Sequence, residues 1–187
     1  MNYRWLRLSA FLVIIAVFTT TFALAQVTVI FTRHAEKATT PANDPPLTVA
    51  GQKRAELLAS MLADSGVDAI YVSELQRTQL TAAPLADRRH LKPIAIPAND
   101  TQGVVNAIRA RSGGVVVVVG HNNKLPQIIA ALGGPNVDIP DDVYDNLFVL
   151  TVGPARSSLL RLHYGSSESV PASAGSMRDV APASPKR

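Results

Sequence analysis

From Gln26 onward, short apolar runs typical of strands alternate with amphipathic stretches typical of helices. This alternation indicates βαβ units, in which a mostly parallel sheet carries helices on both faces. Residues 27–31 and the five valines of residues 115–119 predict the clearest buried strands, because a parallel strand covered on both sides is apolar on both faces. Shorter runs at residues 69–72 and 94–96 predict two more strands. We therefore expect an α/β fold with the valine strand at its centre.

Helices are expected between these strands. Thr48 can cap a helix that ends near Gly66. A later helical stretch, between the second and third strands, should be interrupted by Pro84, which lacks the N–H that a helix interior needs. Residues 124–132 predict the next helix, which Gly133 closes. The residues expected on the buried face of the first helix, from their spacing, are Leu57, Leu58, Met61 and Leu62.

The end of the chain divides into a hairpin and a tail. Residues 147–152 and 157–164 predict an antiparallel hairpin that turns at Gly153-Pro154 and completes the sheet. From Gly165 the chain is rich in Ser, Ala, Pro and Gly, which cannot bury enough apolar surface to offset the entropy of ordering. We expect residues 165–187 to be a disordered tail, which leaves residues 26–164 as one domain.

The N-terminus has the pattern of an export signal. Arg4 and Arg7 precede an apolar run from Leu8 to Phe18, and Ala23-Leu24-Ala25 has small residues at the spacing of a cleavage site. The run is shorter than the roughly 18 apolar residues of a membrane-spanning helix, although residues 19–24 would lengthen it to a borderline anchor. We expect residues 1–25 to be a signal peptide and the mature protein to be periplasmic or secreted, with membrane contact only through this segment if it is kept.

Composition then narrows the classes of function. Removing two arginines from the 18 basic residues leaves 16 against 14 acidic residues, a formal charge of +2. These charges are scattered without a basic stripe, so we expect no nucleic-acid partner. The chain has no cysteine, which excludes disulfides and thiolate metal sites. The lack of cysteine also excludes a zinc deaminase site, although His34-Ala35-Glu36 matches the first half of that motif. We expect no metal and no cofactor.

Two histidines follow the two clearest strands directly. His34 comes after the first strand, and His121 comes after the valine strand. Open α/β sheets place their ligand sites at the carboxyl ends of their strands. Because parallel strands end at the same edge of a sheet, we expect the two histidines to converge there.

Four motifs occur in order along residues 27–164. They are Thr32-Arg33-His34-Ala35-Glu36, Leu47-Thr48-Val49-Ala50-Gly51, Ser73-Glu74-Leu75-Gln76-Arg77-Thr78-Gln79-Leu80-Thr81, and Gly120-His121-Asn122-Asn123. The ordered set resembles the histidine phosphatase (phosphoglycerate mutase-like) superfamily, in its small single-domain branch. Ala35 stands where many members have glycine, which exchanges one small residue for another.

The resemblance implies a role for each central residue. His34 would attack phosphorus as a neutral imidazole and form a phosphohistidine, which divides one difficult displacement into two easier ones. Arg33, Arg77 and His121 would bind the phosphate and stabilise charge on its oxygens without a metal. Three other polar residues would either line this phosphate site or have structural roles: Glu36, Lys37 and Asn123.

The proton donor to the leaving group is left open. Asn122 follows the second histidine where the acid-phosphatase branch of the family has an aspartate, so that branch is disfavoured. Asp100 is the first candidate for the acid, against the alternative that it caps the helix beginning near Thr101. The weaker candidates are Glu74, Asp141 and Asp142.

These features together predict an exported, metal-independent phosphatase. Its substrate would be a small-molecule or protein-borne phosphate, either a phosphomonoester or a phosphohistidine. The domain is short and leaves little chain to form a lid, so we expect an open site. An open site could accept a phosphorylated side chain of a protein or a phosphorylated sugar of an envelope glycolipid. Two alternatives are a catalytically weak phosphate-binding protein of the same fold and a mutase, which must keep a phosphorylated product away from water.

Overall fold

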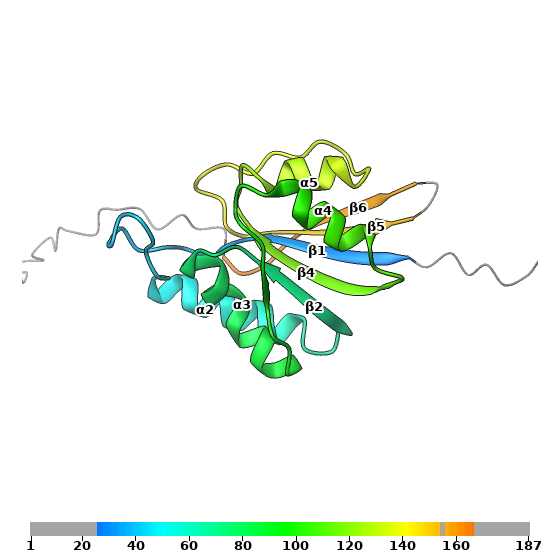
Figure 1. The fold of residues 1–187 in the computed structure, drawn as a ribbon. Coiled ribbons are helices and arrows are strands. Elements are labelled where there is room, and N and C mark those ends of the chain that lie inside the picture. The colour runs from blue at the N-terminus through cyan, green and yellow to red at the C-terminus, as the bar shows by residue number, and fades with distance from the viewer. Residues whose placement is uncertain (1–25, 154–155, 167–187) are drawn as a thin grey trace, which may run out of the picture.

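A computed structural model describes residues 26–153 and 156–166, which form one six-stranded sheet with helices on both faces (Figure 1). The expected signal peptide, residues 1–25, and residues 167–187 of the expected tail lie outside the described part. The strands are β1 (Val27–Arg33), β2 (Val67–Val72), β3 (Ile94–Ala95), β4 (Gly114–Gly120), β5 (Asn146–Val152) and β6 (Ser158–His163). The helices are α2 (Val49–Met61), α3 (Gln76–Arg89), α4 (Thr101–Arg109) and α5 (Leu125–Ala131).

The sheet order is β3-β2-β4-β1-β5-β6. The strands β3, β2, β4 and β1 pair in parallel, and β5 pairs antiparallel with both β1 and β6. This confirms a mostly parallel sheet that a C-terminal hairpin completes. The valine strand β4 lies between β2 and β1, at the centre, as its apolar sequence predicts.

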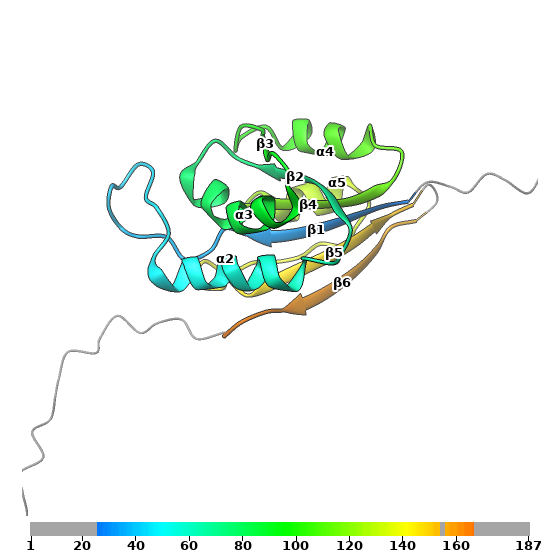
Figure 2. The ribbon, with the colours of Figure 1, turned by 90° about the horizontal axis from the view of Figure 1, so that it is seen from below.

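Each face of the sheet has its own core. In Figure 1, α4 and α5 lie on one side of the sheet and α2 and α3 on the other, and Figure 2 shows the same layers from below. Val116 and Val118 of β4 pack in the core under α4 and α5, whereas Val117 and Val119 pack in the core under α2 and α3. Alternate side chains of a strand point to opposite faces, so an unbroken apolar run is needed at this position.

The buried face of α2 differs from the expected one. Leu57 and Met61 are 38% and 45% exposed, so two of the four residues predicted on this face are not buried. Ala55 and Ala59 are buried instead: Ala59 lies in the core that α2 shares with α3, and Ala55 packs with Ala35 and Leu47 of the segment between β1 and α2. Small alanine side chains allow close helix packing, and a pattern of large apolar residues does not reveal them.

The helix α3 runs through Pro84 rather than being interrupted by it. Proline has no N–H, so the carbonyl of Leu80 loses its helical hydrogen bond. Leu80 is 40% exposed, on a side of the helix where solvent can replace that bond. The prediction of an interruption at Pro84 was therefore wrong.

Within residues 26–153 and 156–166, no helix is both long enough and apolar enough to cross a membrane.

Candidate active site

The loops that follow β1 and β4 bring His34 and His121 together. The strands pair in parallel and in register up to Arg33 and Gly120. The backbone N–H of His34 then donates to the carbonyl of Gly120 at 2.9 Å. The centroids of the two imidazole rings are 5.4 Å apart, with the rings edge to face. This hydrogen bond, which lies just beyond the paired ends of the two strands, therefore fixes the spacing of the His34 and His121 side chains.

Both histidines line an open cavity of about 560 Å³ at this edge of the sheet. Most of the site residues expected from the sequence line this cavity, although they come from motifs that lie far apart along the chain. The candidates that line it are Arg33, His34, Lys37, Arg77, His121, Asn123 and Asp141.

His34 is held as a neutral imidazole. It is 3% exposed, and this burial, together with the charges of Arg33 and Arg77, lowers its pKa to about 3. Its Nδ1 lies 2.8 Å from the carbonyl oxygen of Ala35. A carbonyl oxygen can only accept, so Nδ1 carries the proton and Nε2 keeps its lone pair. This is the tautomer that an Nε2 nucleophile requires.

His121 is also held neutral, and Ser73 positions it. Burial and the charge of Arg77 lower the pKa of His121 to about 4. Its Nε2 lies 3.1 Å from the hydroxyl of Ser73, which also contacts the hydroxyl of Thr78 at 2.9 Å. Ser73 and Thr78 both lie in the third motif, but the sequence alone predicted no role for either residue.

Arg33 anchors a loop as well as lining the cavity. Its Nη1 donates to the carbonyls of Pro140, Asp141 and Val143 at 3.1, 2.6 and 3.1 Å. Its guanidinium also lies over the ring of Tyr144, 4.1 Å from the ring centroid. These contacts fix one side of the guanidinium against the loop between α5 and β5.

The two arginines of the site share a further feature. The Nε atoms of Arg33 and Arg77 are buried and have no hydrogen-bond partner among the described residues. A buried donor without a partner costs about 1–3 kcal/mol. These Nε atoms have almost no accessible surface, but the side chains of Arg33 and Arg77 themselves line the cavity, and their positive charge suits the site to a phosphate-like ligand.

Glu36 does not line the cavity, and Arg54 explains why. The Nε of Arg54 donates to both carboxylate oxygens of Glu36 at 2.9 and 3.1 Å, and Nη2 donates to one of them at 2.8 Å. Arg54 is 7% exposed and also donates to the carbonyls of Tyr164 and Ser166, at 2.8 and 2.9 Å. Arg54 therefore ties the loop of His34 to the end of the domain. The sequence gives one indication of this role: Arg54 is a charged residue among the buried positions of α2.

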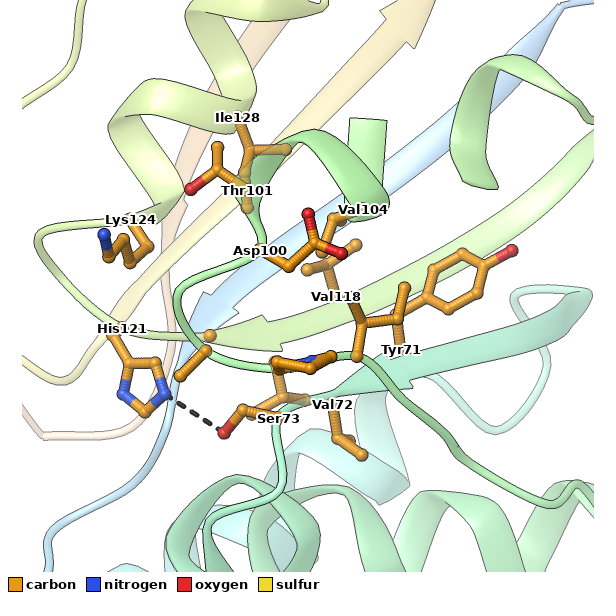
Figure 3. Close-up of a pocket in the computed structure, with 15 residues that line it drawn as sticks. Tyr71, Val72, Ser73, Asp100, Thr101, Val104, Val118, His121, Lys124 and Ile128 are labelled. Atoms are coloured by element: carbon orange, nitrogen blue, oxygen red, sulfur yellow. Dashed lines mark hydrogen bonds between the residues drawn. The ribbon is translucent and has the colours of Figure 1, made fainter. Parts of the chain in front are cut away.

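Asp100 lies beside the cavity and not in its wall. Its Oδ1 accepts from the backbone N–H of Gly103 at 2.8 Å, so it caps α4. Figure 3 shows Asp100 at the start of α4. It lines a smaller pocket of about 30 Å³, whose wall also includes His121. Among the carboxylates of the described residues, Asp141 alone lines the cavity of His34, and it accepts from the side-chain amide of Asn122.

The remaining acidic candidates lie elsewhere. Glu74 accepts from the backbone N–H of Ala98 at 2.7 Å, and neither Glu74 nor Asp142 lines the cavity. The part of the chain that the structure describes contains no group of three or more histidine and carboxylate side chains able to hold a metal ion.

Comparison with known proteins points to one family. Residues 29–99 match the histidine phosphatase superfamily, branch 1. Phosphoserine phosphatase 1 of Hydrogenobacter thermophilus is 40% identical over 74 residues, which are 36% of this chain and 35% of that protein. The probable phosphoglycerate mutase GpmB of Yersinia enterocolitica is 40% identical over 55 residues, 29% of this chain and 26% of that protein. The chain thus matches between about a quarter and about a third of the length of these curated relatives.

Solved structures show the same fold over most of the described residues. The protein histidine phosphatase SixA complexed with tungstate has a TM-score of 0.63 and 20% identity, and the match covers 73% of this chain and 97% of SixA. A mutant phosphoserine phosphatase from Entamoeba histolytica, complexed with phosphoserine, has a TM-score of 0.56 and 14% identity, with 77% and 99% covered. At sequence identities of 20% and 14%, the similarity to these structures shows a shared fold.

In the folded protein His121 should remain neutral down to about pH 4, which is its pKa, and His34 should remain neutral down to about pH 3. The unfolded chain binds protons on both from about pH 6.5 downward, so the free energy of unfolding should decrease as the pH falls from 6.5 toward 4. NMR titration of the imidazole carbons measures both pKa values directly. Titration of His34 near pH 6.5 would contradict the buried neutral site.

Replacing Arg54 with Met should lower the free energy of unfolding by about 3 kcal/mol, because Glu36 then keeps a largely buried charge without its partner. Glu36→Gln in the same background should recover part of this loss, and urea unfolding of the single and double variants measures the coupling. The control is Arg88→Met, whose partner Glu56 lies 3.2 Å away on the surface, with side chains 48% and 61% exposed. Equal effects of Arg54→Met and Arg88→Met would contradict a structural role for Arg54.

Proposed function

The chain belongs to the histidine phosphatase superfamily, branch 1, and we propose that it hydrolyses phosphomonoesters through a phosphohistidine formed on His34. One observation carries the proposal. A neutral imidazole with its Nε2 lone pair available lies in a cavity wall beside the side chains of Arg33 and Arg77, which supply positive charge for binding an anion. A nucleophile and an anion site in one cavity are what phosphoryl transfer needs.

The reaction proceeds in two displacements. Nε2 of His34 forms a bond to phosphorus, the bond from phosphorus to the leaving oxygen breaks, and that oxygen takes up a proton. Water then attacks the phosphohistidine, loses a proton, and releases inorganic phosphate with Nε2 restored. Arg33, Arg77 and His121 hold the phosphoryl oxygens through both steps, while the proton on Nδ1 stays bonded to the carbonyl of Ala35.

Asp141 takes the place of Asp100 as the proposed proton donor. Asp100 is occupied as the cap of α4 and does not line the cavity, whereas Asp141 does. A general acid must come within hydrogen-bond reach of the leaving oxygen, either directly or through one water. Asp141 belongs to the loop that Arg33 anchors, so the contacts of Arg33 also place the proposed acid.

We also propose that the phosphatase acts outside the cytoplasm. The support is the sequence of residues 1–25, which has two arginines, an apolar run and small residues at the spacing of a cleavage site. The large open cavity supports a substrate that is presented on another molecule or that diffuses in freely.

The proposed activity is tested by hydrolysis of phenyl phosphate and of a simple alkyl phosphate in the presence of a chelator. The wild-type protein should release phosphate from both, and His34→Ala should reduce the rate by at least about 10³-fold, because it removes the group that forms the covalent intermediate. His90→Asn is the matched control, since His90 ends α3 outside the cavity and adopts a left-handed backbone that asparagine tolerates. Micromolar binding of phosphate without turnover would establish the alternative, a phosphate-binding protein.

The same assay distinguishes the two candidate acids. A phenol leaves with little need for a proton, whereas an alcohol needs one. Asp141→Asn should therefore lower the rate with the alkyl phosphate by about 10²-fold, the lower end of a general acid's contribution, and affect phenyl phosphate much less. Asp100→Asn keeps an oxygen that can cap α4 and should leave both rates nearly unchanged. A selective loss of alkyl phosphate hydrolysis in Asp100→Asn would assign the acid to Asp100 instead.

A further inference from the structure

Two buried hydroxyl groups connect His121 to the first turn of α3. The side chains belong to Ser73 and Thr78, which are 5% and 0% exposed. The Oγ1 of Thr78 lies 2.9 Å from the carbonyl oxygen of Leu75 and 2.9 Å from the Oγ of Ser73. The Oγ of Ser73 lies 3.1 Å from Nε2 of His121 (Figure 3). The three contacts form one chain from a backbone carbonyl to the imidazole.

The carbonyl at the end of this chain sets the direction of its hydrogen bonds. A carbonyl oxygen can only accept, so the hydroxyl of Thr78 donates to Leu75. Ser73 then donates its one hydroxyl hydrogen to Thr78, since otherwise two oxygens would face each other at 2.9 Å without a hydrogen between them. The Ser73 oxygen therefore accepts from the backbone N–H of Leu75 and from Nε2–H of His121. His121 is the tautomer that carries its proton on Nε2.

The other ring nitrogen of His121 is thereby left with a lone pair. Figure 3 shows Nδ1 turned away from Ser73. It has no hydrogen-bond partner among the described residues and keeps accessible surface, and His121 lines the cavity of His34. The two histidines are thus opposite tautomers, since His34 carries its proton on Nδ1. Each has one nitrogen that can only accept.

This lone pair cannot bond to a phosphoryl dianion without an added proton. A phosphomonoester is mostly a dianion at neutral pH, because its second pKa is about 6, and its free oxygens then only accept. A proton placed between Nδ1 and such an oxygen would join them. In the empty site the charges that face His121 are mostly positive and disfavour this proton, whereas a bound dianion offsets them. These charges are Arg77, Arg33 and Lys124, against Glu74.

We propose that Thr78 and Ser73 lock His121 in the tautomer with a bare Nδ1, so that the site binds a phosphoryl dianion together with one proton, held between Nδ1 and a phosphoryl oxygen. Ser73 and Thr78 are positioning residues, because neither lines the cavity. The proton enters from solvent with the substrate and leaves with inorganic phosphate, so the net reaction is unchanged. This inference rests on the proposed function, since it describes how the same site holds its phosphoryl group.

NMR of the ligand-free protein tests the tautomer at about pH 7, where His121 is neutral. The nitrogen chemical shifts of an imidazole distinguish a protonated nitrogen from one with a lone pair. In the wild type and in Thr78→Ser, which keeps the hydroxyl, Nε2 of His121 should carry the proton. Thr78→Val leaves the Ser73 hydroxyl free to donate to Nε2, so the proton should move to Nδ1. A wild-type proton on Nδ1, or an unchanged tautomer in Thr78→Val, would overturn the inference.

Calorimetry with tungstate, a tetrahedral dianion that cannot be hydrolysed, counts the proton. Titrations at about pH 7.5 in buffers of different ionisation enthalpy should show uptake of about one proton per bound ion by the wild type, because one lone pair takes one proton. Ser73→Ala removes the acceptor of Nε2–H, so the ring can carry its proton on Nδ1 and donate it to the ion. Uptake should then fall below about half a proton.

The matched control is Ser157→Ala, which removes a hydroxyl that donates to the carbonyl of Leu132 at 2.7 Å, outside the cavity. It should take up as much as the wild type. Lack of tungstate binding, binding without proton uptake, or equal uptake by Ser73→Ala and the wild type would overturn the inference. Failure of the proposed function appears separately, as a lack of phosphate release from phenyl phosphate while the tautomer and the proton uptake are as expected.

Discussion

The candidate site depends on the parallel pairing of β1 with β4 at the centre of the sheet. The pairing ends both strands at the same level, and the bond from His34 N to Gly120 O, 2.9 Å long, continues it by one residue into the loops. The two imidazoles are thereby placed edge to face and buried. Burial keeps both imidazoles neutral. His34 must be neutral in order to react, because a protonated imidazole has no lone pair with which to attack phosphorus.

A second set of contacts supports the loop of His34 from behind. Arg54 of α2 joins Glu36 to the carbonyls of Tyr164 and Ser166, and the hydroxyl of Tyr164 lies 3.0 Å from that of Thr32. The residues after β6 therefore hold the first strand and its loop in place. On the other side, Arg33 fixes the loop that carries Asp141. The proposed nucleophile and the proposed acid are thus each positioned by a buried arginine.

The features that were predictable from the sequence are local or periodic. The central position of the valine strand follows from its apolar run, and the caps Thr48 and Asp100 follow from side chains that can accept from a backbone N–H three residues on. The convergence of His34 and His121 follows from strand polarity. The pairing of Glu36 with Arg54, the contacts of Arg33 and the place of Asp141 join residues far apart in the chain. No spacing rule connects such residues, so the structure was needed to find them.

The central claim is that His34 carries the phosphoryl group between the two displacements, and rapid-quench trapping tests it most directly. Wild-type protein mixed with phenyl phosphate and quenched in base should yield a phosphorylated peptide that contains His34, stable in base and lost in acid. The same label should be lacking in His34→Ala. Phosphate release at the wild-type rate with no label on His34 at any quench time, or with the label on another residue, would contradict the account.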